Sequence, residues 1–321
     1  MSSAETTAVA DIGGTNTRVA LTSGAGLRPD SVRRFRNSDF SSFDSVLQAY
    51  LEETSVPSVE GVCVALAGPV SDGAGSLTNL DWQLEEDDLA QKTGAKRVRL
   101  LNDLQAQGYA LGSLQSDQIL HVVSGKPARP GATQLVIGVG TGFNAAAVVE
   151  TVGGRVVLPS EAGHANLPVR TERELRLCRF VETAHGFPAV EDVLSGRGLE
   201  RVHTFLGAEQ GINRSASAAD IMASVAVGDA EAEATLEMFI GLLGTVAGNL
   251  SLIHLPFGGV YLAGGVARSI SPYLTRMGFD AAFRNKGRFA EFMAAYSVSV
   301  IDDDFAALSG CAAYLHAISN Q

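Results

Sequence analysis

Residues 9–21 read Val-Ala-Asp-Ile-Gly-Gly-Thr-Asn-Thr-Arg-Val-Ala-Leu. Apolar residues on both sides of the pair Gly13-Gly14 predict two strands joined by a tight turn. Glycine lets the backbone approach a ligand closely, and successive N–H groups in such a turn can face phosphate oxygens. Asp11, at the end of the first strand, can meet a hydrated Mg²⁺. A lone turn of this kind is also found in ordinary hairpins, where glycine supplies a positive φ.

A second segment repeats this plan. Residues 135–149 read Leu-Val-Ile-Gly-Val-Gly-Thr-Gly-Phe-Asn-Ala-Ala-Ala-Val-Val, again two apolar runs around a turn rich in Gly and Thr. Another glycine-bearing hairpin follows each copy, at 23–26 and at 152–155. Two similar units in one chain predict a duplicated α/β domain. We expect the two turns to face each other across a cleft and to hold a polyphosphate from both sides, which one hairpin cannot do.

The composition indicates a compact globule of two domains. Of 321 residues, 46% are hydrophobic and 18% are charged, which argues against disorder. The formal net charge of −11 disfavours nucleic acid as a partner, because phosphates require a basic surface. An anionic nucleotide can still bind, since backbone N–H groups, Mg²⁺ and a few local cations suffice.

Cysteine usage and the first residues predict a cytoplasmic protein. Cys63, Cys178 and Cys311 show no paired metal spacing, and we interpret them as small buried hydrophobes in a reducing compartment. Residues 1–5 lack the basic and then apolar pattern of a signal peptide. The uncharged run 238–255 approaches the length of a membrane span, but its polar residues and the lack of flanking basic residues favour a buried core helix. We expect no membrane partner.

Apolar periodicity predicts the order of the elements. Strands are expected within 8–22, 32–35, 61–67, 97–101, 134–149 and 259–263, and helices at 43–53, 87–93, 171–184, 218–227, 230–255 and 305–318. Gly241, Gly244 and Gly248 recur at spacings of three and four, which suits close packing of their helix against another element. The last helix is expected to return to the first domain. This gives a smaller domain of residues 1–108 and 305–321 and a larger domain of residues 109–304.

Polar residues follow several of these strands, at the positions where ligands bind in open α/β sheets. Asn102 and Asp103 follow the strand 97–101. Asn and Asp are favoured at helix N-caps, so Asn102 can cap the next helix and leave Asp103 in its first turn. A carboxylate placed there can also take a proton from a substrate hydroxyl that attacks phosphorus. The segment by itself leaves both roles open, a cap and a catalytic base.

Glu161 and His164 follow the strand 156–158. A spacing of three makes a zinc pair conceivable, but zinc proteases use a spacing of four, and no third ligand lies nearby in the sequence. We therefore expect no zinc. A turn with a surface histidine is one interpretation of this segment. The other is a sugar site, because a carboxylate and a histidine that can donate or accept suit sugar hydroxyls.

Three further segments allow a structural and a functional interpretation. Glu191 marks a solvated helix start or adds a carboxylate to the site. Asn79 lies in a structural turn or hydrogen-bonds a sugar. Gly264 and Gly265, which follow the strand 259–263, form a simple C-cap or turn, or they permit the close approach of a flat base.

In combination these segments resemble the bacterial glucokinase family, within the larger fold group of actin-like proteins, hexokinases and Hsp70 ATPases. The resemblance covers nearly the whole chain. It rests on motifs in the same order and at approximately the same spacing: 11–18, 101–103, 138–142, 161–164, 193–199, 248–250, 262–265 and 285–289. It implies two duplicated actin-like (ribonuclease H-like) α/β domains with an interdomain cleft.

The resemblance also implies roles for individual residues. Asp103 would be the general base. The sugar would be bound by Asn79, Asn102, Asp103, Glu161, His164 and Glu191. ATP would be bound by Asp11, Ile12, Gly13, Gly14, Thr15, Asn16, Gly140, Thr141, Gly142, Gly264 and Gly265, with Asp11 reaching Mg²⁺ through water. Related repressor-kinase sugar enzymes carry a cysteine-rich zinc motif after the sugar histidine. This chain has no cysteine between 63 and 178, so it resembles the zinc-free branch.

The chain departs from the family pattern at three places. Phe143-Asn144 stands where the second phosphate motif usually continues Leu-Gly. Because asparagine tolerates a left-handed conformation, we expect the turn to be preserved. Ser160 replaces a usual glycine, and Leu80-Asp81 replaces a pair similar to His-Thr near the predicted sugar site.

We therefore predict an ATP-dependent hexose kinase, a glucokinase that phosphorylates glucose at the 6-hydroxyl. Closure of the two lobes would exclude water from the reaction. The alternatives are a kinase of the same fold for mannose, fructose or an N-acetylated amino sugar, and a non-catalytic sugar-sensing protein. A chaperone-like ATPase would need a further substrate-binding domain. The expected partners are a sugar, ATP and a second copy of the chain in a homodimer.

Overall fold

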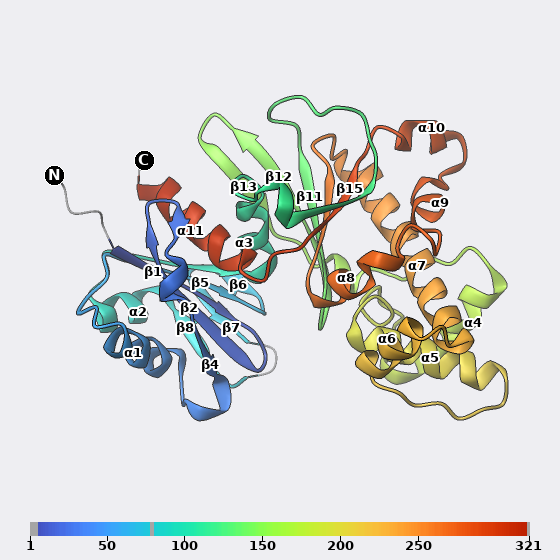
Figure 1. Ribbon diagram of the computed structural model, residues 1–321, viewed down its shortest axis with the longest axis horizontal. Coiled ribbons are helices and arrows are strands. Elements are labelled where there is room, and N and C mark those ends of the chain that lie inside the picture. The colour runs from blue at the N-terminus through green and yellow to red at the C-terminus, as the bar shows by residue number, and fades with distance from the viewer. Residues whose placement is uncertain (1–5, 78–79, 320–321) are drawn as a thin grey trace. The chain divides into compact units, whose positions relative to one another are not determined.

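The structure is a computed structural model that describes residues 6–77 and 80–319 (Figure 1). The chain divides into two compact units. Unit 1 comprises Met1–Gln115, Val152–Val157 and Asp303–Gln321, and unit 2 comprises Ser116–Thr151 and Leu158–Asp302. The segment Val152–Val157 contains most of strand β13 (Gly154–Leu158).

Unit 1 is built on a mixed sheet with the strand order β3-β2-β1-β5-β9, in which β4 also pairs with β2. These strands are β1 (Thr6–Ile12), β2 (Asn16–Ser23), β3 (Gly26–Leu27), β4 (Arg33–Arg36), β5 (Gly61–Leu66) and β9 (Arg97–Asn102). β1 and β2 form the predicted antiparallel hairpin, whereas β5 runs parallel to β1 and β9 runs parallel to β5. A separate small sheet contains β6 (Val70–Ser71), β7 (Ala74–Ser76) and β8 (Gln83–Glu85).

Helices cover both faces of the unit 1 sheet. Side chains alternate between the two faces along a strand, so Val62 and Val64 of β5 belong to one core and Cys63 belongs to the other. The first core is covered by α1 (Phe43–Glu53) and α2 (Glu86–Thr93), and the second by α3 (Asp103–Ala110) and α11 (Ala306–Ser319). α3 and α11 lie side by side in Figure 1. Burial on both faces explains why β5 is apolar along its whole length.

Unit 2 repeats this arrangement. Its sheet contains, in order, β10 (Ile119–Val123), β15 (Val298–Ile301), β14 (Val260–Ala263), β11 (Gln134–Val139) and β12 (Phe143–Thr151). β11 and β12 are antiparallel, β14 runs parallel to β11, and β15 runs parallel to β14. The series β12-β11-β14-β15 therefore corresponds to β2-β1-β5-β9 of unit 1. This correspondence confirms the predicted duplication.

The helices of unit 2 are α4 (Glu172–His185), α5 (Gly196–Glu209), α6 (Ala218–Ala226), α7 (Ala230–His254), α8 (Gly265–Ile270), α9 (Phe279–Arg284) and α10 (Ala290–Met293). Sequence patterns predict α4, α6 and α7 but not α5, the three short helices or the strands β10 and β15. α5 has glycine at its first and third positions, which weakens its helical pattern. β15 has only four residues and, unlike the equally short β14, no glycine pair follows it to mark its end.

α7 is the central helix of unit 2. It is long and apolar enough to cross a membrane, but 61% of its most apolar window is buried inside the protein. Leu236, Phe239 and Leu243 belong to the hydrophobic core that it forms with the sheet and the other helices of the unit. The structure thus confirms the core helix predicted from the uncharged run 238–255.

Burial of the three cysteines is confirmed in part. Cys63 and Cys311 are fully buried between the unit 1 sheet and α11. Cys178 on α4 is only partly buried, so the prediction was wrong for this residue. The reason is the orientation of the helix, because α4 turns Leu177 rather than Cys178 into the core.

Two of the three glycines on α7 allow α9 to pack closely. A Cβ atom at Gly244 would lie 2.7 Å from the carbonyl oxygen of Phe279, and one at Gly248 would clash with the carbonyl oxygen of Phe283. A Cβ atom at Gly241 would meet nothing within 4 Å among the described residues. The predicted close packing is therefore confirmed for Gly244 and Gly248 and wrong for Gly241, because α9 is too short to reach that turn of α7.

Lys286, just after α9, strengthens the same contact. Its Nζ donates to the carbonyl oxygen of Thr245 at 2.8 Å and to Oδ1 of Asn249 at 2.7 Å. Burial, together with the nearby Arg170 guanidinium, lowers the pKa of Lys286 to about 8. The motifs 248–250 and 285–289, which the sequence left without a role, thus meet at the junction of α7 and α9.

We predict opposite effects for alanine at two glycines of the same helix. Gly244→Ala should lower the free energy of unfolding by about 1–3 kcal/mol, because the added methyl group overpacks the contact with α9. Gly241→Ala, the matched control, should raise it by about 0.5–1 kcal/mol, because alanine is the better helix former and its methyl group meets open space. Urea unfolding measures both. Equal effects of the two changes would contradict the close α7–α9 contact.

Candidate functional site

The strand register of unit 1 brings two predicted motifs to one edge of the sheet. Ile12 of β1 pairs with Leu66 of β5, and Leu66 pairs with Asn102 of β9. These three residues form one row at the carboxyl ends of parallel strands. The Gly13-Gly14 turn and Asp103 both begin directly after this row, so they lie at the same edge, where open α/β sheets bind ligands.

A buried asparagine holds the first glycine turn. Asn37 is only 2% exposed, and its Nδ2 donates to the carbonyl oxygen of Gly13 at 2.8 Å. Its Oδ1 accepts from Oγ1 of Thr17 at 2.8 Å, and its N–H donates to the carbonyl oxygen of Thr15 at 2.9 Å. Within the turn, the N–H of Gly13 donates to the carbonyl oxygen of Asn16 at 3.0 Å. Asn37 is not among the predicted site residues, because no spacing in the sequence relates it to the turn.

Gly13 does not have the positive φ that glycines of ordinary tight hairpins have. An added Cβ would lie 3.4 Å from the carbonyl oxygen of Asn16, an ordinary contact distance. The backbone conformation therefore does not require glycine here. This favours the interpretation in which the missing side chain leaves room for a ligand.

Asp11 pairs with Arg18 across the β1–β2 hairpin. Arg18 Nη1 lies 3.5 Å from Oδ2 of Asp11 and donates to the carbonyl oxygen of Asp304 at 3.2 Å. Burial raises the pKa of Asp11, and the Arg18 guanidinium opposes this rise. A carboxylate at a strand end can make a second-sphere contact to a hydrated divalent ion.

Asn102 caps helix α3, as predicted. Its Oδ1 accepts from the N–H of Leu104 at 3.0 Å, and its Nδ2 donates to the carbonyl oxygen of Gly68 at 3.0 Å. Gln105 completes a capping box, since its Oε1 accepts from the N–H of Asn102 at 3.1 Å. Asp103 is the first residue of α3, and its half-buried carboxylate accepts from the N–H of Leu104 at 2.7 Å. The capping role is confirmed for Asn102, and the role of Asp103 as a base stays a prediction.

The second glycine turn, in unit 2, is joined to the start of helix α5. The N–H of Gly140 donates to the carbonyl oxygen of Gly142 at 2.9 Å. The N–H of Gly196 donates to the carbonyl oxygen of Gly140 at 2.8 Å. Ser195 is the N-cap of α5 and accepts from the N–H of Gly198 at 3.0 Å. The N-terminus of a helix favours anions, so this juxtaposition suits a phosphate. The motif 193–199 stands out in the sequence, but its spacing does not indicate that it lies beside the second glycine turn.

Gly264 and Gly265 lie at the same edge of the unit 2 sheet. Gly138 of β11 pairs with Ala263 of β14, so both strands end at this level. Gly264 has a φ of 101°, and an added Cβ would lie 2.6 Å from the carbonyl oxygen of Val139. The interpretation of this pair as a C-cap is wrong, because Gly264 is the N-cap of α8. The strand end here turns directly into a helix.

Glu191 lies in a turn and not at a helix start, because α5 begins only at Gly196. Its Oε2 accepts from the N–H of Phe143 at 2.9 Å, and its own N–H donates to the carbonyl oxygen of Gly163 at 2.9 Å. Glu191 therefore joins the second glycine turn to the predicted sugar loop. That connection depends on tertiary contacts, so the spacing in the sequence could not indicate it.

The predicted sugar loop, residues 160–164, forms a short 3₁₀ turn at Ala162–His164. Glu161 and His164 are both exposed, so their side chains are accessible to a ligand. The second glycine turn is preserved, as expected, without a left-handed conformation at Asn144. Asn144 is a β12 strand residue paired with Gly138, and it has no positive φ. Asn79 lies outside the residues that the structure describes.

A family model described as Glucokinase matches residues 8–318. The chain belongs to the glucokinase family. A curated relative, the glucokinase of Rhizobium meliloti (strain 1021), is 34% identical over 309 residues, which are 95% of this chain and 91% of the relative. The chain is an ATP-dependent glucose kinase.

Solved structures agree with this family membership. A crystal structure of a glucokinase from an Antarctic psychrotroph matches with a TM-score of 0.85 and 30% identity, covering 97% of this chain and 99% of that one. A ROK family glucokinase from Streptomyces griseus, at 19% identity and a TM-score of 0.66, covers 96% and 98% and is similar in fold. The predicted fold of two duplicated actin-like α/β domains is confirmed.

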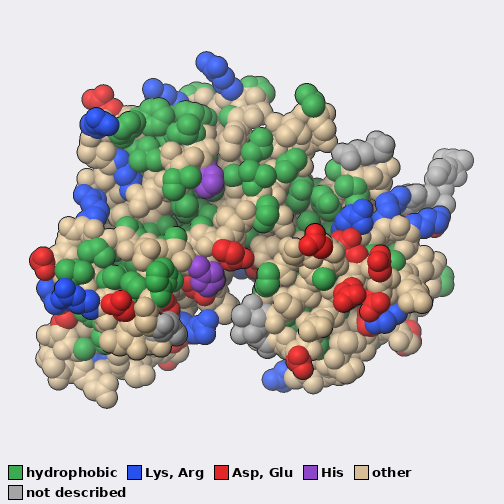
Figure 2. Space-filling view, turned by 180° about the vertical axis from the view of Figure 1, so that it is seen from behind, with side chains coloured by type: hydrophobic (Ala, Val, Ile, Leu, Met, Phe, Trp, Pro, Cys, Tyr) green, Lys and Arg blue, Asp and Glu red, His purple; other side chains and the backbone are tan. Residues whose placement is uncertain are grey.

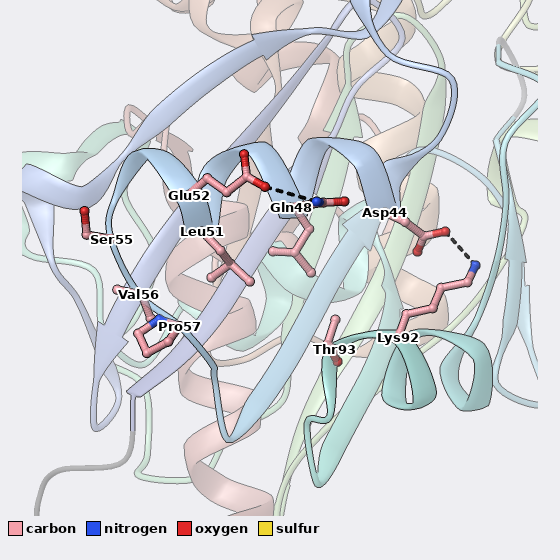
Figure 3. A pocket seen from close by; sticks show the side chains of 10 residues that line it. Asp44, Gln48, Leu51, Glu52, Ser55, Val56, Pro57, Lys92 and Thr93 are labelled. Carbon is pink, nitrogen blue, oxygen red and sulfur yellow. Dashed lines mark hydrogen bonds and ion pairs between the residues drawn. The ribbon is translucent and has the colours of Figure 1, made fainter.

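Two further features concern the binding of metal ions and of small molecules. Within residues 6–77 and 80–319, no group of three or more His, Cys, Asp or Glu side chains is placed to hold a metal ion. A surface pocket of about 720 Å³ lies on α1 and α2; its lining includes the ion pair of Asp44 and Lys92, 2.6 Å apart, and the apolar residues Leu51 and Val56 (Figure 3). None of the residues predicted to bind sugar or nucleotide lines this pocket, so it is not the predicted site.

Proposed function

We propose that Asp103 is the general base that takes the proton of the glucose 6-hydroxyl as this oxygen attacks the γ-phosphorus of ATP. The observation that carries this proposal is the row Ile12, Leu66 and Asn102. It places the carboxylate at the start of α3, at the sheet edge where the first glycine turn begins. A base beside a phosphate-binding turn is the arrangement that phosphoryl transfer to an alcohol requires.

We propose that glucose is bound by Glu161, His164, Asn102, Asp103 and Asn79, with Glu191 supporting the loop of residues 160–164. The exposed side chains of Glu161 and His164 support this assignment, since both are accessible to hydroxyl groups. Asn102 uses one amide hydrogen for Gly68 and one lone pair for the cap, so a sugar would meet its second amide hydrogen and its remaining lone pair.

We propose that ATP is bound by the two glycine turns and by Gly264-Gly265. The support in unit 1 is the set Asp11, Ile12, Gly13, Gly14, Thr15 and Asn16 at the sheet edge. In unit 2, Gly140, Thr141 and Gly142 lie beside the N-terminus of α5. The Streptomyces griseus structure contained glucose and AMPPNP. That pair of ligands supports a nucleotide site and a sugar site in the same fold.

We propose Mg²⁺ as the metal of the reaction and no zinc. Mg²⁺ retains waters and is bound by one or two carboxylates together with substrate phosphates, so it does not need a cluster of protein ligands. Asp11, at the end of β1 beside the first glycine turn, would meet such a hydrated ion through water. When bound with ATP, Mg²⁺ neutralises charge on the phosphates.

We propose that the protein acts as a homodimer in the cytoplasm. Unit 2 exposes a group of aromatic side chains, Phe257, Phe289 and Phe292, which pack edge to face. Hydrophobic side chains also gather on the face of the molecule seen in Figure 2. Apolar surface of this kind supports association with a second copy. A light-scattering mass equal to that of one 33.5 kDa chain would contradict the dimer.

We predict that Asp103→Asn lowers kcat by about 10²–10⁴-fold, because an amide cannot take the proton. Glucose binding, measured by calorimetry, should stay close to that of the unchanged protein, since the amide retains the shape of the side chain. Asp87→Asn, an exposed residue in the first turn of α2, is the matched control and should leave kcat unchanged. Near-normal turnover of Asp103→Asn would remove Asp103 from the role of base.

We predict that Glu161→Ala raises the KM for glucose about tenfold or more, because it removes a charged hydrogen-bond acceptor for sugar hydroxyls. The KM for ATP should change little, since the glycine turns lie on other strands. Glu172→Ala, an exposed glutamate at the start of α4, is the control. An increase in the KM for ATP alone would place Glu161 on the nucleotide side.

We predict that activity survives exhaustive treatment with a zinc chelator once Mg²⁺ is supplied in excess. The spacing of Glu161 and His164 and the lack of a cysteine cluster beside them motivate this expectation. A coupled assay of ADP release measures the result. Loss of activity that only Zn²⁺ restores would contradict the zinc-free site.

A further inference from the structure

Two departures from the family pattern, Asn144 and Ser160, are in direct contact. Nδ2 of Asn144 donates to the carbonyl oxygen of Ser160, and Oδ1 of Asn144 accepts from the N–H of Ala162 at 2.9 Å. The two backbone groups that it binds lie immediately before and after Glu161. One side-chain amide therefore holds the backbone on both sides of the predicted sugar-binding carboxylate.

The serine adds a second connection to the same strand. Oγ of Ser160 donates to the carbonyl oxygen of Ala145, and the N–H of Ala145 donates to Oδ1 of Asn144 at 2.8 Å. The Ser160 hydroxyl also lies 3.3 Å from Oδ1 of Asn144, farther than its acceptor at Ala145, and Nδ2 of Asn144 donates to the carbonyl oxygen of Ser160. The two side chains therefore contact each other as well as the backbone of the neighbouring segment.

The other half of the loop is held by backbone contacts. The carbonyl oxygen of Gly163 accepts from the N–H of Glu191 at 2.9 Å, and a Cβ at Gly163 would clash with the carbonyl oxygen of Phe143. Glu161 itself has a backbone conformation outside the helix and strand regions, with φ −123° and ψ 52°. Its carboxylate is exposed and takes no part in these anchoring contacts.

We propose that Asn144 is a positioning residue for Glu161, and that with Ser160 it fixes the sugar loop on strand β12 directly after the second glycine turn. This inference rests on the proposed role of Glu161 in binding the sugar. Glycine at either position would provide no side-chain bond, so the loop would sample more backbone conformations and bind the sugar less well. Asn144 contacts neither sugar nor nucleotide in this role and acts only through the geometry of residues 160–162.

The direct test is Asn144→Ala, which removes both bonds that flank Glu161. We expect the KM for glucose to rise by about threefold to tenfold, with kcat and the KM for ATP within about twofold of their starting values. Asn166→Ala, an exposed asparagine two residues beyond the loop, is the matched control and should leave all three unchanged. A rise in the KM for glucose with the control, or none with Asn144→Ala, overturns the inference.

A double-mutant cycle separates positioning from a general loss of structure. In a Glu161→Ala background, adding Asn144→Ala should change the KM for glucose by less than about twofold, because the positioned group is already absent. Multiplied effects would overturn the inference and leave the sugar role of Glu161 intact. If Glu161→Ala alone has no effect on the KM for glucose, the proposed sugar role fails as well.

Asn144→Asp provides a second variant with the shape of the original side chain. It retains an acceptor for the N–H of Ala162 but loses the donor to the carbonyl oxygen of Ser160. Thermal unfolding followed by circular dichroism establishes that the variant is folded. A folded Asn144→Asp protein with a raised KM for glucose supports the inference, and an unchanged KM overturns it.

Discussion

The rest of the site depends on the register of the parallel strands. In unit 1, Ile12, Leu66 and Asn102 form one row, and in unit 2, Gly138 and Ala263 pair at the same level. Parallel strands with this register end at a common edge, so the turns and helix starts that follow them gather there. Residues distant in the sequence thereby become neighbours without any bond between their side chains.

Asparagine amides then hold the turns at these edges. Asn37 binds the first glycine turn, Asn102 binds the start of α3 and the carbonyl of Gly68, and Asn144 binds the sugar loop. A side-chain amide has both a donor and an acceptor, so it can replace a backbone partner where a loop has no strand to pair with. The duplicated units thus use the same chemistry at different positions.

The glycines of the site differ in what they allow. Gly264 has a positive φ, and a Cβ there would lie 2.6 Å from the carbonyl oxygen of Val139. A Cβ at Gly163 would clash with the carbonyl oxygen of Phe143. The fold does not require glycine at Gly13 or Gly140, because neither has a positive φ. An added Cβ at Gly140 would contact nothing within 4 Å among the described residues. The first pair is required by the fold. The second pair leaves space beside the backbone, which is what a bound phosphate needs.

The sequence by itself determined the duplication, the hairpins, the core helix α7 and the cap at Asn102, because these follow from local periodicity and from turn and cap chemistry. Only the tertiary structure decided the contacts of Asn37, Asn144, Glu191 and Gly196, because each binds a segment that no spacing relates to it. Likewise, only packing showed that α9 needs Gly244 but not Gly241. Local patterns specify elements, whereas partners across the fold depend on how those elements are brought together.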